Sequence, residues 1–176
     1  MSGLPVLRRV WCLVTCVLFM AATGATSTLA QSGDHAAPGD VVLTVTYGDG
    51  SGRPKREITF AELLALPKAG FETTTVWTNG PQTFEGVWLA DLVAELGVES
   101  GSMEMLALND YLVDFEVDGL AERKALVAYR HNDELMSPRH KGPLWIVFPY
   151  DEGPQFRTEI TYVSSIWQLD RIEVLP

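Results

Sequence analysis

The sequence predicts an α+β domain with a mixed, partly barrel-like β-sheet and a few short helices. Short apolar runs rich in β-branched residues recur along the chain and are separated by turn residues, which is typical of strands. Apolar residues at helical spacing occur in only two short segments. Hydrophobic residues make up 47% of the 176 residues and charged residues 20%, which is enough apolar material for the core of one domain.

Local signals define the elements of the first half. A strand is expected over residues 41–47, where every second residue is apolar and a glycine-rich turn follows. A short helix is expected to begin after Thr59, because Glu62 stands three residues later in the order of a capping box, and Pro67 ends it. A second helix is expected over residues 88–96, which carry apolar residues at helical spacing and precede a glycine.

The second half is expected to be mostly strand. Residues 103–108 and 111–117 are apolar runs on either side of an Asn-Asp turn, and apolar residues alternate with mostly charged ones in the second run. Further strands are expected at residues 126–131, 144–148 and 172–175. Two short helices among about seven strands favour the α+β class.

Residues 1–30 have the three-part pattern of a secretory signal peptide. Arg8 and Arg9 precede the apolar run 10–22, and small residues follow up to Ala30. The apolar run is shorter than the roughly 20 residues that cross a bilayer core as a helix. We therefore expect a cleaved signal peptide rather than a membrane anchor.

Cleavage near Ala30, with Ala25 as the alternative position, would leave residues 31–40 as a polar, flexible leader. Residues 41–176 would then form one globular domain. The protein is expected to be periplasmic or secreted.

Composition excludes several functions. The formal net charge of −10 repels phosphate backbones, so nucleic-acid binding is not expected. Both cysteines, Cys12 and Cys16, lie inside the signal peptide, which leaves no thiol for catalysis or metal binding in the mature chain. One of the three histidines, His35, lies in the leader, so a three-histidine metal site is not expected either.

A concentration of basic residues between residues 130 and 141 is the first candidate site. Arg139 and His140 are its leading contacts for a small anionic or polar ligand, with Arg157 as a third, because guanidinium and imidazole groups form charge-assisted hydrogen bonds. The alternative is a solvated loop whose acidic residues pair with these basic ones.

A second candidate group stands at the ends of predicted strands. A cleft would gather them if the strand ends meet, whereas the alternative is that Asn-Asp only forms a turn. The group consists of Trp77, Asn79, Asn109, Asp110 and Tyr111. Three other tryptophans are flanked by apolar residues and are expected to pack in the core: Trp88, Trp145 and Trp167.

Five segments follow one another in the order ITFAELLALP, VWTNGPQTFEGVWLADLVAELG, ALNDYLVDFEV, LVAYRHNDELMSPRHKGPLWIVFP and SIWQLDRIEV. This order resembles the oxidoreductase molybdopterin-binding domain of the sulfite oxidase type, in the compact form of periplasmic methionine sulfoxide reductase subunits. The resemblance covers roughly residues 58–174, and the fourth segment is its most specific part. It implies an α+β fold with a mixed, partly barrel-like sheet and a molybdopterin cofactor in an oxidoreductase.

The sequence departs from this family where the metal would bind. Family enzymes hold molybdenum through a cysteine thiolate shortly before a Trp-Ser or Trp-Thr pair, and the spacing from Trp77 places Thr73 at about that position. A neutral hydroxyl is a poor substitute for a soft, anionic sulfur ligand. Lys141 also interrupts the His-Gly element of the family, since it stands between His140 and Gly142. No bound metal or cofactor is therefore predicted, and molybdopterin is the alternative.

Two functions remain. The first is an exported, cofactor-free binding module that uses the old cofactor cleft for a small anionic or polar ligand, or for a periplasmic or membrane protein partner. The alternative is a periplasmic molybdopterin-dependent oxidoreductase of the sulfite oxidase or methionine sulfoxide reductase type. The missing cysteine favours the first.

Overall fold

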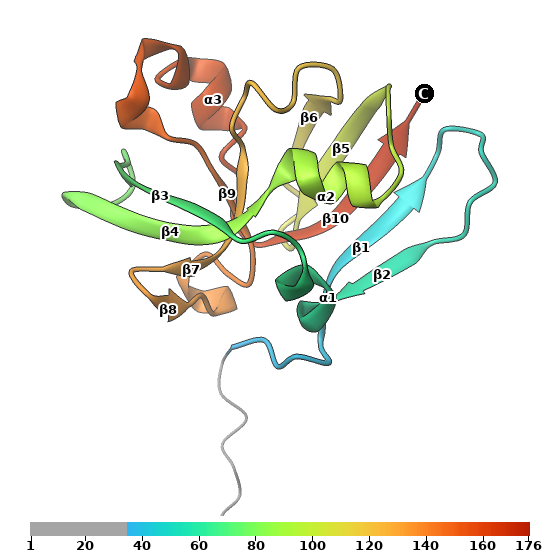
Figure 1. Ribbon diagram of the computed structural model, residues 1–176, viewed down its shortest axis with the longest axis horizontal. Coiled ribbons are helices and arrows are strands. Elements are labelled where there is room, and N and C mark those ends of the chain that lie inside the picture. Colours follow the sequence, from blue (N-terminus) through green and yellow to red (C-terminus); the bar gives the residue numbers. More distant parts are fainter. Residues whose placement is uncertain (1–34) are drawn as a thin grey trace, which may run out of the picture. The chain divides into compact units, whose positions relative to one another are not determined.

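The computed structural model describes residues 35–176, which form helices and two β-sheets (Figure 1). The expected signal peptide and its cleavage position near Ala30 lie outside the described residues. In the described part of the chain, no helix is long and apolar enough to cross a membrane.

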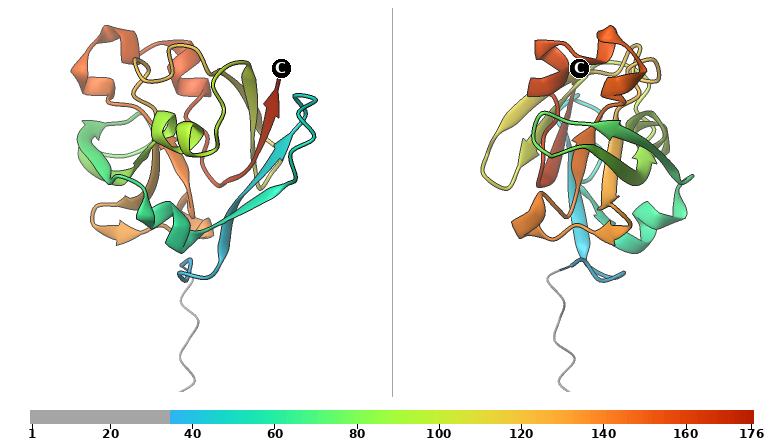
Figure 2. Two further views of the ribbon diagram at one scale, coloured as in Figure 1. Left: turned by 45° about the vertical axis from the view of Figure 1, so that its right-hand side comes forward. Right: turned by 90° about the vertical axis from the view of Figure 1, so that its left-hand side faces the viewer.

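The first sheet is mixed, as expected. Its strand order is β2-β1-β10-β5-β6, and β1 and β10 are parallel while the other neighbours are antiparallel. Figure 2 shows β1 and the carboxy-terminal β10 side by side. The strands are β1 (Val41–Tyr47), β2 (Arg56–Thr59), β5 (Ser102–Ala107), β6 (Leu112–Glu116) and β10 (Leu169–Leu175).

The second sheet is antiparallel and has the order β3-β4-β7-β8, with β9 paired to β7. Neither sheet closes on itself, so residues 35–176 contain two open sheets rather than a closed barrel. The strands are β3 (Ala69–Thr74), β4 (Pro81–Trp88), β7 (Leu126–His131), β8 (Glu134–Leu135) and β9 (Trp145–Val147).

The helices are short. The capping box of the first is confirmed: the Thr59 hydroxyl accepts the backbone N–H of Glu62 at 3.3 Å, and the Glu62 carboxylate accepts the backbone N–H of Thr59 at 2.7 Å. The second ends before Gly97, whose φ of +66° suits a helix terminus. The described helices are α1 (Phe60–Ala65), α2 (Leu89–Glu95), α3 (Glu159–Val163) and the 3₁₀ turns η1 (Pro138–His140), η2 (Tyr150–Glu152) and η3 (Pro154–Phe156).

Residues just before β1 are tied to the start of α1. The backbone N–H of Phe60 donates to the carbonyl of Asp40 at 2.9 Å, and that of Ala61 donates to the carbonyl of Pro38 at 2.8 Å. The first N–H groups of a helix have no acceptor within the helix. The described end of the expected leader supplies those acceptors.

Two apolar clusters hold the sheets together. The main core contains residues of both sheets, such as Val45 and Ile172 with Val127 and Ile146. A smaller cluster lies on the other face of the second sheet and includes Phe84, Leu126, Ala128, Met136, Trp145 and Val147. Because alternate residues of β7 enter the two clusters, residues 126–131 form the nearly continuous apolar run seen in the sequence.

The expectation that Val41, Leu43 and Val45 share one buried face is wrong at the start of β1. Val41 is 49% exposed and Val42 only 5%, because the register with β2 shifts between Val41 and Leu43. Strands β2, β3, β4 and β8 are additional to the expected strands. In β4, Pro81 and Gly86 mask the strand pattern, and Gly86 is required because a Cβ atom there would lie 2.1 Å from the Val127 carbonyl oxygen.

Thr59→Ala should lower the free energy of unfolding by about 1 kcal/mol, because the cap hydroxyl no longer accepts a helix N–H. Urea unfolding monitored by circular dichroism measures this. The double variant with Glu62→Ala is the control. Because each side chain bonds to the backbone N–H of the other residue and the two side chains bond to each other, the double change should cost less than the sum of the two single changes. Strictly additive costs would contradict a coupled cap.

Candidate functional site

An aromatic cavity of about 440 Å³ is the candidate site. It forms where the loop after β3, the turn between β5 and β6, and the segment from α3 to β10 meet. Four of its eight lining side chains are aromatic, and none carries a charge. The lining residues are Val76, Trp77, Asn109, Tyr111, Tyr162, Val163, Ser165 and Trp167.

Trp77 is held in the cavity wall by edge-to-face contacts. Its ring centroid lies 5.9 Å from that of Trp167 and 6.0 Å from that of Tyr162, with interplanar angles of 78° and 83°. Trp145 and Tyr150 contact it in the same manner at 6.0 and 6.2 Å. Such pairs add about 0.5–1.5 kcal/mol each beyond the buried area. The ring is therefore fixed before any ligand arrives.

The turn between β5 and β6 supplies the opposite side. The side-chain oxygen of Asn109 accepts the backbone N–H of Tyr111 at 3.3 Å, and the Tyr111 hydroxyl donates to the carbonyl of Val163 at 2.9 Å. The turn and the cleft are thus both present: Asn109 shapes the turn and lines the cavity. Asp110 does not line it; its carboxylate is bonded to Arg171 at 2.7 Å.

Buried hydroxyls fix the segment behind the cavity. The Tyr150 and Ser165 hydroxyls are 2.6 Å apart, and the Ser165 hydroxyl donates to the carbonyl of Thr161 at 2.8 Å. Burial raises the pKa of Tyr150 far above its ordinary value. Tyr150 therefore stays protonated and serves as a positioning group rather than a base.

Thr73, at the expected cysteine position, has a structural role. Its side chain is on β3, is 1% exposed and does not line the cavity. The hydroxyl accepts the backbone N–H of Asp151 at 3.1 Å, and the Asp151 carboxylate accepts the backbone N–H of Thr74 at 2.6 Å and its hydroxyl at 2.9 Å. These bonds tie β3 to η2.

The donors present here do not fit a thiolate-bound molybdenum. The Thr73 hydroxyl is buried and already hydrogen-bonded, and it would have to lose its proton to act as an anionic ligand. Among residues 35–176, no three His, Cys, Asp or Glu side chains are grouped to hold a metal ion.

The basic candidates lie away from the aromatic lining. Arg139 and His140 are in η1, where the Ser137 hydroxyl and His140 Nδ1 are 3.0 Å apart. Arg157 donates to the carbonyl of Tyr150 at 2.7 Å and lies 3.6 Å from the Asp151 carboxylate. None of the three lines the cavity, so of the predicted site residues the structure brings together Trp77, Asn109 and Tyr111. The ligand-binding roles themselves stay predictions.

Lys141 is the basic residue that reaches the aromatic cluster. Its ammonium lies 4.1 Å from the ring centroid of Trp167 and 5.1 Å from that of Trp145. Burial lowers the pKa of Lys141, and burial together with the charge of Lys141 lowers the pKa of His131. The three tryptophans expected in the core, Trp88, Trp145 and Trp167, all pack in the smaller apolar cluster, and Trp167 also lines the cavity.

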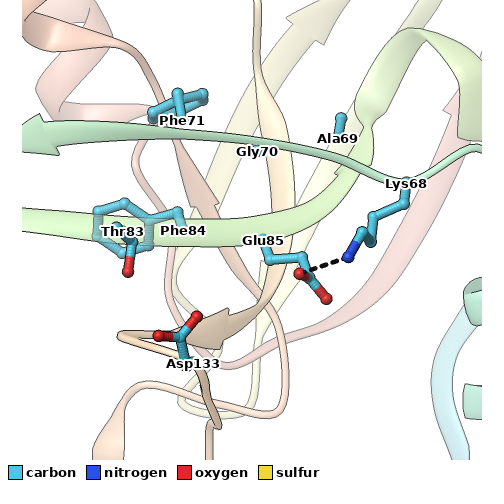
Figure 3. A pocket seen from close by; sticks show the side chains of 8 residues that line it. All are labelled: Lys68, Ala69, Gly70, Phe71, Thr83, Phe84, Glu85 and Asp133. Atoms are coloured by element: carbon cyan, nitrogen blue, oxygen red, sulfur yellow. Dashed lines mark hydrogen bonds and ion pairs between the residues drawn. The ribbon is translucent and has the colours of Figure 1, made fainter.

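A second depression, of about 350 Å³, lies along the edge of β3. Figure 3 shows Lys68 and Glu85 reaching toward each other across it, and their side chains bond at 2.9 Å. Arg130 approaches the same carboxylate at 3.5 Å. Lys68 and Arg130 both pair with Glu85, and the depression is smaller than the aromatic cavity, which is therefore the stronger candidate.

Asp151→Asn should destabilise the protein at neutral pH and much less in acid. The bonds from Thr74 hold the pKa of Asp151 below its ordinary value, so its charged form stabilises the folded state above the unfolded pKa of about 3.9. That contribution disappears as the pH falls through the folded pKa. Urea unfolding at pH 7 and pH 3 measures it, with Asp114→Asn, an exposed carboxylate on β6, as control. An equal effect of Asp151→Asn at both pH values would contradict this role.

Comparisons with known proteins agree with the observed fold. No family model matches the chain. The uncharacterized oxidoreductase YuiH of Bacillus subtilis (strain 168) is 28% identical over 99 residues, which are 53% of this chain and 50% of that protein. The sulfane dehydrogenase SoxCD from Paracoccus pantotrophus matches with a TM-score of 0.57 at 17% identity, over 79% of this chain and 39% of that one.

The chain thus spans about half the length of the curated relative and less of the solved structure. At 17% identity, the structural likeness concerns the fold alone. It confirms the predicted α+β class, with a fold similar to that of the sulfane dehydrogenase.

Proposed function

We propose that the chain is an exported binding module that keeps a sulfite-oxidase-like fold and holds a small ligand in the aromatic cavity, without molybdenum. One observation carries the proposal. Among the residues that the structure describes, three of the eight exposed large hydrophobic side chains line this cavity, and three more stand within two residues of a lining residue in the sequence. They are Val76, Leu108, Tyr111, Leu112, Ile160 and Val163.

This concentration is unfavourable unless something covers it. Val76 is 64% and Ile160 69% exposed, and contiguous exposed apolar surface marks binding sites in soluble proteins. A preformed apolar cavity with few polar groups is the usual form of a small-molecule site. Asn109 supplies the polar group here. The remaining exposed hydrophobic residues, Val41 and Leu64, are on β1 and α1, which contribute nothing to the lining.

The lining favours a polar ligand over an anionic one. A buried anion needs a paired cation or several N–H donors, and the lining contains no Lys, Arg or His side chain. The ligand of this cavity is therefore largely apolar with an uncharged or cationic polar group. A periplasmic or membrane protein that inserts an apolar side chain is the competing occupant.

Oxidoreductase activity is the second candidate, because the relative from Bacillus subtilis is described as an uncharacterized oxidoreductase. The hydrogen bond between Thr73 and Asp151 argues against it, because the position expected for the cysteine thiolate holds a hydroxyl that is already bonded.

The uncharged fluorophore N-phenyl-1-naphthylamine should bind saturably at one site, with energy transfer from tryptophan. Val76→Asp should weaken binding about tenfold, because a carboxylate at the cavity loses part of its hydration when the probe binds. Leu64→Asp is the matched control, since it places the same charge on an exposed apolar position of α1.

Fluorescence titration of the three proteins gives the comparison. Absence of saturable binding, or equal weakening by both substitutions, would reject the cavity as the binding site.

A further inference from the structure

We infer that the ligand of the aromatic cavity is an organic cation that carries an alkylated ammonium group. This inference rests on the proposed function of the cavity and specifies its ligand class. It stands on the arrangement of the aromatic rings, on the charges around the cavity and on the position of Lys141.

Four aromatic side chains line the cavity. Tyr162 and Trp167 each stand nearly perpendicular to Trp77, at interplanar angles of 83° and 78°, and all three line the cavity. Tyr111 provides a fourth ring, fixed by the hydrogen bond from its hydroxyl to the Val163 carbonyl at 2.9 Å. Aromatic faces carry negative electrostatic potential, and boxes of such rings bind methylated ammonium groups in other proteins.

Carboxylates outnumber guanidinium groups beside the turn between β5 and β6. Asp110 directly follows the lining residue Asn109, and the guanidinium of Arg171 bonds to two carboxylates, those of Asp110 at 2.7 Å and Asp170 at 3.0 Å. One positive charge thus meets two negative ones. The other nearby guanidinium, that of Arg157, lies 3.6 Å from the Asp151 carboxylate. The chain as a whole has a formal charge of −10, which attracts cations over longer distances.

Lys141 shows that this cluster accepts a cation. Its ammonium lies 4.1 Å from the centroid of Trp167, and no carboxylate between residues 35 and 176 forms an ion pair with it. The contacts of this ammonium are thus with the indole rings of Trp167 and Trp145. A second cation on Trp167 would be repelled by this resident charge, so removal of the Lys141 charge should tighten the binding of a cationic ligand and leave a neutral one unaffected.

Choline and 3,3-dimethylbutan-1-ol form the matched probes, because they have the same shape and differ only in the atom, charged nitrogen or neutral carbon, that bears the three methyl groups. Each is titrated into the mature protein and followed by the indole N–H signals in nitrogen-15 NMR spectra. Choline should bind about tenfold more tightly than the alcohol and shift the Trp77 and Trp167 signals.

Two substitutions test the geometry. Tyr111→Leu should weaken choline binding about fivefold, whereas Tyr111→Phe, which keeps the ring and loses only the hydrogen bond to Val163, should weaken it much less. Lys141→Met keeps the apolar stem and removes the charge, and should tighten choline binding roughly threefold without changing the affinity for the alcohol.

The outcomes separate the two proposals. Equal affinity for choline and the alcohol, or binding of the naphthylamine probe without any binding of choline, would overturn the inference of a cation and leave the cavity as a binding site. Failure of all three compounds to bind would overturn both.

Discussion

The packing of Trp77 is the interaction on which the rest of the site depends. Its ring contacts four other aromatic rings edge to face, and it packs against both the main core and the smaller cluster on the outer face of the second sheet. Trp77 belongs to the loop after β3, whereas its partners come from β9, η2, α3 and the segment before β10. This one side chain therefore joins distant parts of the chain and gives the cavity a rigid wall.

The end of β3 that leads into this loop has a structural role of its own. Thr73 and Trp77 are four residues apart, yet they have separate tasks. The Thr73 hydroxyl accepts the N–H of Asp151 and so joins β3 to η2. A side chain bound to a metal would not be available for this hydrogen bond. Aromatic rings line the nearby cavity, and in the proposed function its shape and ring electrostatics select the ligand. Binding of such a ligand requires no redox-active group.

Local signals in the sequence predicted local structure well. The capping box at Thr59, the glycine after α2 and the continuous apolar run of β7 depend on neighbours within a few residues, and the structure confirms them. The buried face of β1 was wrong because a shift of register against β2 is a property of the pair of strands. Helix α3 is only five residues long and begins at the Thr158 cap, which is too short for a visible helical period, so the contributions of Tyr162 and Val163 to the cavity were missed. Trp77 and Asn109 could be predicted from their place at strand ends, whereas the separation of Arg139, His140 and Arg157 follows from long-range contacts that no local pattern contains.

The central claim is that this fold acts here as a binding module without a molybdenum cofactor. Elemental analysis of protein purified from its own host, or from another host with an intact molybdopterin pathway, tests it most directly, because the cofactor is then present while the chain folds. The account predicts far less than stoichiometric molybdenum, and it predicts that Thr73→Cys alone does not restore activity, since the hydroxyl it replaces holds β3 to η2. Stoichiometric molybdenum in the unaltered protein, together with turnover of a sulfoxide or of sulfite, would contradict it.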